Sequence, residues 1–136
     1  MGAWGHRNFE NDGALDFIWK VEEQGVSAIV KAIDTVATFD ENEYLDSSEC
    51  EELQAAVEFI AAAKGNPSED FPENAEDWLA NYKGSELTNA DLVEKSNQAL
   101  DRLLRASEMK ELWEEAGSYD TWAATINDLK KRITNI

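Results

Sequence analysis

Four residues near the N-terminus have the types and spacing that could hold a metal ion: His6, Glu10, Asp12 and Asp16. His6 is the only histidine in the chain, and imidazole nitrogen and carboxylate oxygen atoms together suit several divalent ions. A helix would place Asp12 and Asp16 on one face, because they are four residues apart. A structural interpretation competes with this one: Asp12 caps a helix, Asp16 is solvated or pairs with Lys20, and His6 is a surface residue. We favour the structural interpretation and keep a metal-binding or hydrolytic site as the alternative.

Cys50 is the second candidate for chemistry and the only cysteine of the chain. It lies in the run Ser-Glu-Cys-Glu-Glu near the expected start of a helix. The helix start would lower the pKa of the thiol, whereas the flanking glutamates would raise it. His6 is the only imidazole available to activate it, so a Cys–His nucleophile has little support. A lone cysteine also excludes an internal disulfide and fits a reducing compartment.

The acidic loop that begins at Asp40 has part of a calcium-binding pattern. Oxygen-bearing side chains recur from Asp40 to Glu51 with the spacing of such a loop. The sixth position, however, is Leu45 rather than glycine, and Tyr44 stands where a short oxygen ligand is needed. We therefore expect a loop whose residues 46–48 provide the cap of the next helix.

Composition narrows the classes of partner. The 136 residues carry 29 acidic and 12 basic side chains, for a formal net charge of −17. Such a chain repels phosphate backbones and anionic membrane surfaces, so we expect no nucleic-acid or membrane binding. A basic protein partner fits this charge, and so does acidity that only keeps the protein soluble. We find no signal peptide and no apolar run of membrane-spanning length, and we expect a cytoplasmic protein.

Apolar residues recur at helical spacing, and no segment alternates as a strand would, so we predict an all-α fold. One compact bundle of about seven helices would occupy residues 1–136 as a single domain. The expected helices cover 13–23, 26–39, 46–64, 72–82, 89–105, 107–117 and the segment after 120. The expected core anchors are Trp4, Phe17, Ile33, Val57, Trp78, Leu100, Trp113 and Trp122.

The N-terminal arm, residues 1–10, is expected to pack on this bundle. Asn11 or Asp12 would cap the first helix, because their short side chains accept from its first N–H groups. We place Leu15 on the buried face of that helix, with Phe17 beside it, and Phe9 would pack against Leu15 or Phe17 across the helix start. Further along the chain, we expect Thr88 and Asp120 to act as N-caps.

The opening MGAWG, with the residues that follow it, resembles the start of the family catalogued as domain of unknown function 4259 (DUF4259). Weaker similarities are the run 67–70 with Pro72, the run 112–117, and Trp122. The match departs at Arg7 and Gly13, where the family pattern has a glycine and a larger residue. The resemblance implies a small helical domain, and it implies no assigned activity. The residues that carry the opening similarity are Phe9, Glu10, Asn11, Asp12, Ala14, Leu15 and Asp16.

Recognisable catalytic motifs are missing from the sequence. It has no Gly-rich phosphate loop, no CxxC pair, no HExxH motif and no nucleophile elbow. We expect no cofactor and favour a non-enzymatic protein-interaction module, for example an immunity-type inhibitor of a basic partner. The acidic stretches 40–52 and 69–77 would be its docking surfaces. A monomer and a small homo-oligomer both remain compatible with the sequence.

Overall fold

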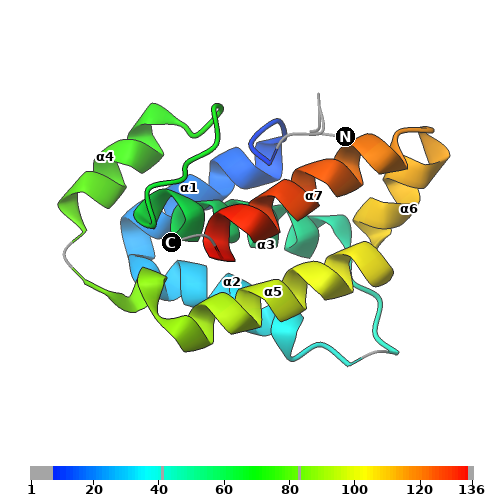
Figure 1. Cartoon of the computed structure of the whole chain (residues 1–136), viewed down its shortest axis with the longest axis horizontal. Helices are drawn as coiled ribbons and strands as arrows, with labels where there is room; N and C mark the ends of the chain where they lie inside the picture. The colour runs from blue at the N-terminus through cyan, green and yellow to red at the C-terminus, as the bar shows by residue number, and fades with distance from the viewer. Residues whose placement is uncertain (1–7, 41, 83, 135–136) are drawn as a thin grey trace.

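The computed structural model describes residues 8–40, 42–82 and 84–134, and within these ranges it contains seven α-helices, one short 3₁₀ helix and no strand (Figure 1). The all-α prediction is therefore confirmed. None of these helices combines the length and the apolar character needed to cross a membrane. The elements are α1 (Asp12–Gln24), α2 (Val26–Ala37), α3 (Ser47–Ala63), α4 (Glu73–Asn81), η1 (Glu86–Thr88), α5 (Ala90–Arg105), α6 (Glu108–Glu115) and α7 (Tyr119–Thr134).

Helix α3 occupies the centre of the bundle. It packs against α1, α2, α5 and α7, and Figure 1 shows it between α1 on one side and α2 and α5 on the other. Every residue from Leu53 to Ala61 is buried. A helical segment that is buried around its whole circumference has to be surrounded by other elements. The alanines at 55, 56 and 61 are fully buried and allow neighbouring helices to approach closely.

The core contains most of the predicted anchors. Five of them are at most 1% exposed: Phe17, Ile33, Val57, Leu100 and Trp122. Two others, Trp78 and Trp113, are only partly buried and pack against the edge of the core. The remaining predicted anchor, Trp4, lies outside the described residues.

An aromatic row links the N-terminal segment to α3 and α4. Phe9 meets Phe71 edge-to-face with ring centroids 5.6 Å apart, and Phe71 meets Phe59 of α3 at 5.4 Å. Phe59 continues to Trp78 of α4 at 5.6 Å. The expected burial of Leu15 is wrong, because its side chain is 36% exposed. The contact of Phe9 with Phe71 anchors the segment before α1 to a loop about half the chain length further along the sequence.

The start of α1 agrees with the expectation from the sequence, and the starts of α5 and α7 differ from it. Asn11 caps α1, and its Oδ1 accepts from the backbone N–H of Ala14 at 2.7 Å. Asn89 rather than Thr88 caps α5, since Thr88 belongs to η1 and donates its hydroxyl to the carbonyl of Ser85 at 3.2 Å. Helix α7 begins at Tyr119, so Asp120 lies in its first turn and is not the cap.

Candidate functional site

The four metal candidates do not form a described site. His6 lies outside the described residues. Asp12 and Asp16 are exposed on α1, and Glu10 is half-buried before it. Across residues 8–40, 42–82 and 84–134, no group of three or more His, Cys, Asp or Glu side chains is arranged to hold a metal ion. Lys20, a possible partner of Asp16, instead forms an ion pair with Glu52 of α3.

The acidic loop before α3 is organised by helix capping and by an arginine. Asp46 and Glu49 form a capping box, in which the Glu49 N–H donates to Asp46 Oδ1 at 3.0 Å. The guanidinium of Arg102, which is 5% exposed, donates to the carbonyl oxygens of Asp40 at 3.1 Å and Glu43 at 2.7 Å. These loop carbonyls thus bind a cation that α5 supplies. The loop that resembles a calcium site has a structural role.

Cys50 is fully buried at the start of α3. Burial raises the pKa of its thiol from the usual 9.0 to about 12, and hydrogen bonds from the Met109 backbone and the Ser107 side chain offset this only in part. The thiol therefore stays protonated at neutral pH. Because the thiolate is the reactive form, Cys50 is a poor nucleophile in the folded protein.

We expect iodoacetamide to alkylate Cys50 far more slowly in the native protein than in the urea-unfolded chain at pH 9. About half of the unfolded thiol is ionised there, against about one thousandth of a thiol with a pKa of about 12. The unfolded state also loses this proton first, so the thiol makes the free energy of unfolding fall as pH rises from 9 towards 12. Mass spectrometry measures the alkylation rate in both states. Equal rates for the native and the unfolded chain would contradict the burial of the thiol.

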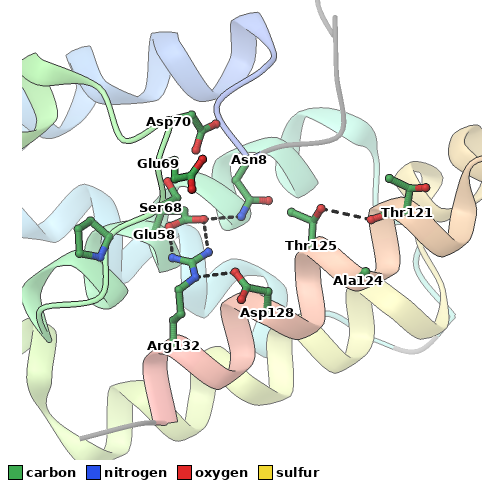
Figure 2. A pocket seen from close by; sticks show the side chains of 11 residues that line it. Asn8, Glu58, Ser68, Glu69, Asp70, Thr121, Ala124, Thr125, Asp128 and Arg132 are labelled. Carbon is green, nitrogen blue, oxygen red and sulfur yellow. Dashed lines mark hydrogen bonds and ion pairs between the residues drawn. The ribbon is translucent and has the colours of Figure 1, made fainter.

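A cleft of about 660 Å³ lies between α7 and the loop that connects α3 to α4. The loop contributes the side chains of Ser68, Glu69 and Asp70 (Figure 2). Helix α7 contributes a row of residues spaced by about one helical turn, from Thr121 through Thr125 and Asp128 to Arg132. Asn8 and Glu58 line the cleft between these two walls.

An ion pair that is buried at its Glu58 end joins α3 to α7 at the cleft. Glu58 of α3 is 1% exposed, and both of its oxygens accept from Arg132 of α7, at 2.7 and 2.8 Å. Asn8 Nδ2 donates to Glu58 Oε2 at 2.5 Å, and Asn8 Oδ1 accepts from Gln54 at 2.7 Å. Arg132 Nε also donates to Asp128 at 2.7 Å. Figure 2 shows the guanidinium between the carboxylates of Glu58 and Asp128.

The electrostatics of Arg132 suit a permanent structural cation. Burial lowers the pKa of Arg132, but the hydrogen bonds and charges of Glu58 and Asp128 outweigh burial and raise that pKa above its usual value. The same side chain donates to the carbonyl of Asn66 at 3.1 Å, and the Asn66 amide donates back to the Arg132 carbonyl at 3.0 Å. Arg132 therefore ties α7 to both α3 and the loop that follows it.

The pairing of Glu58 with Arg132 is missing from the sequence analysis, although one signal pointed to it. Gln54 and Glu58 stand four residues apart within the otherwise apolar run 53–63. A charge in such a helix is buried and has to be paired. Arg132 could equally be explained by the negative end of the α7 dipole. The sequence therefore indicates that Glu58 needs a partner without identifying it.

The described lining of the cleft offers oxygen atoms and no thiol or imidazole. Glu69, Asp70 and Asp128 add negative charge around the neutralised pair. One oxygen of Asp70 already accepts from the backbone N–H of Phe9 at 3.2 Å. This chemistry suits the binding of hydrogen-bond donors. The clearest role of the cleft floor is to hold the N-terminal segment, α3 and α7 together.

Comparison with known proteins places the chain in one family. The family model described as "Domain of unknown function (DUF4259)" matches residues 2–125. No curated protein matches the chain, and no solved structure matches it. Because the family model covers most of the chain, the protein belongs to this family.

Proposed function

We propose that this DUF4259 protein is a non-enzymatic protein-interaction module that binds a basic protein partner. The observation that carries the proposal is how its charges are arranged. The chain has 29 acidic side chains and only 12 lysines and arginines, which leaves a net charge of −17 that no basic side chain balances.

Many of the described basic side chains are already occupied within the protein. Arg132 is held by Glu58 and Asp128, and Arg102 donates to loop carbonyls. Several surface lysines each pair with a carboxylate on their own or a neighbouring helix. These pairs are Lys20–Glu52, Lys95–Asp34, Lys110–Glu114 and Lys130–Asp101.

The remaining surface potential is strongly negative, and it favours approach by a cationic protein. At physiological ionic strength, charges interact over about 8 Å, so the attraction operates once the two surfaces are close. Complementary charge raises the association rate and rejects acidic partners. An immunity-type inhibitor that covers a cationic surface of its target would use this arrangement directly.

Mass spectrometry of proteins captured on the immobilised, folded chain tests the proposal. A lysate of the source cell is applied and then washed at low salt and at high salt. An unrelated protein of similar size and net charge serves as the control for non-specific adsorption. We expect one basic protein to be retained at low salt, released at high salt and absent from the control. Capture of no specific basic protein would contradict the proposed function.

A further inference from the structure

Helix α1 has two exposed apolar side chains, Trp19 and Leu15, on the side away from the core. Its inner face is fully covered, with Phe17, Ile18 and Val21 at most 1% exposed. On the outer face, Trp19 is 69% exposed, and Leu15, one helical turn before it, is 36% exposed. An exposed tryptophan keeps a large apolar area in contact with water, which is unfavourable, so its exposure calls for an explanation.

Acidic side chains surround this tryptophan. On a helix, the surface neighbours of a residue lie three and four positions away. For Trp19 these neighbours are Leu15, Asp16, Glu22 and Glu23, all of which are exposed. The adjacent basic residue, Lys20, is turned towards α3 by its ion pair with Glu52. Within the part of the chain that the structure describes, no basic side chain forms an ion pair with Asp16, Glu22 or Glu23, so Trp19 and Leu15 are flanked by a rim of unpaired carboxylates.

Further acidic residues reinforce the start of the same helix. Asp12 is exposed in its first turn, and the side chain of Glu51 leans over Gly13, where a larger residue would collide with it. Burial, together with the charges of Asp12 and Glu52, raises the pKa of Glu51 above its usual value. Asp12 and Glu51 thus extend the acidic surface of α1 towards α3.

We propose that the outer face of α1, with Trp19 at its centre, is the surface that docks a basic segment with an apolar face. This inference rests on the proposed function and gives it a location. Tryptophan is the residue type that most often dominates binding energy at the centre of an interface. Lysines or arginines flanking the apolar contact would then meet Asp16, Glu22 and Glu23 on the rim.

The acidic charge around Trp19 favours a basic segment over two other possible occupants, a second copy of the chain and a lipid surface. A second copy of the chain would bring its own acidic rim against this one, and like charges at an interface oppose association. An anionic lipid surface is repelled for the same reason. Among the described residues, the other exposed aromatic is Tyr44, which is 59% exposed but donates its hydroxyl to Glu111 at 3.3 Å. Tyr44 therefore serves as a matched control position for an aromatic-to-alanine exchange.

A synthetic helical peptide of lysine and leucine, with the leucines on one face, is a defined probe for this surface. Calorimetry should show binding to the wild-type chain that weakens by at least about tenfold in Trp19→Ala, the loss typical of a central aromatic contact. The double variant Glu22→Lys with Glu23→Lys should weaken it as well. Tyr44→Ala should bind within about twofold of wild type. In nuclear magnetic resonance spectra, the amides shifted by the peptide should map to α1.

Three results would overturn this docking surface. The first is a peptide affinity that is the same for Trp19→Ala and wild type, or that falls as much in Tyr44→Ala as in Trp19→Ala. The second is a shift map that avoids α1. The third is self-association of the wild type in ultracentrifugation that Trp19→Ala abolishes, which would make a second copy the occupant. Repeating the lysate capture with Trp19→Ala distinguishes failure of the two proposals. If wild type and Trp19→Ala retain the same basic partner equally, the docking surface on α1 is wrong and the proposed function stands. If wild type retains no basic partner, the proposed function itself is contradicted.

Discussion

Replacing Arg132 with alanine is expected to lower the free energy of unfolding by about 3–5 kcal/mol, the usual loss when one partner of a buried ion pair is removed. The reason is the carboxylate left behind. Glu58 is 1% exposed and takes two of its hydrogen bonds from Arg132, at 2.7 and 2.8 Å. Urea unfolding followed by circular dichroism measures the loss as a change in the midpoint at constant slope.

Two variants show whether the unpaired charge causes the loss. Lys131→Ala changes the exposed neighbour on the same turn of α7 and should shift stability by no more than about 0.5 kcal/mol. The double variant Glu58→Leu with Arg132→Met replaces the pair by apolar side chains and should recover most of the stability. If the double variant is as unstable as Arg132→Ala, the desolvated carboxylate is not the cause.

The second large effect is expected at Trp122. Its side chain is 1% exposed and packs beside Tyr119 with ring centroids 5.8 Å apart. Trp122→Ala should lower the free energy of unfolding by about 3–5 kcal/mol, since it removes a buried ring and leaves a cavity. The same exchange at Trp19, which is 69% exposed, should change it by no more than about 0.5 kcal/mol.

This comparison also bears on the docking surface of α1. If Trp19→Ala unfolded as readily as Trp122→Ala, Trp19 would be a structural residue. A loss of peptide binding in Trp19→Ala could then result from unfolding rather than from a missing surface contact. Equal stability of Trp19→Ala and wild type makes any loss of peptide binding a property of the surface. Denaturant titrations of the two variants beside wild type settle this point.

Several features of the fold follow from local sequence. The apolar stripe at Trp122, Ile126, Leu129 and Ile133 indicates one buried face of a helix, and all four residues are at most 1% exposed in α7. Gly25 interrupts the first helical segment, and its φ of 73° is a backbone conformation that glycine adopts readily. Side chains three or four positions apart share a helix face whatever surrounds the helix, so such patterns are readable without the fold.

Some expectations failed because two local signals competed. Thr88 and Asn89 are both good caps, and the short helix η1 takes Thr88 and leaves Asn89 to cap α5. Leu15 lies beside the apolar face of α1, at its boundary. Whether a boundary residue is buried depends on how far the neighbouring helices extend around α1, and periodicity contains no information on that.

The surfaces and the cleft depended on contacts between distant residues. Glu58 and Arg132 are 74 residues apart, and Lys20, which could have paired with Asp16, instead pairs with Glu52, 32 residues away. Local spacing determined the seven helices, most of their buried faces and the acidic character of the protein. Tertiary packing alone decided which of the many carboxylates are buried, which are neutralised and which remain to meet a partner, because a charge finds its partner through the packing of whole helices.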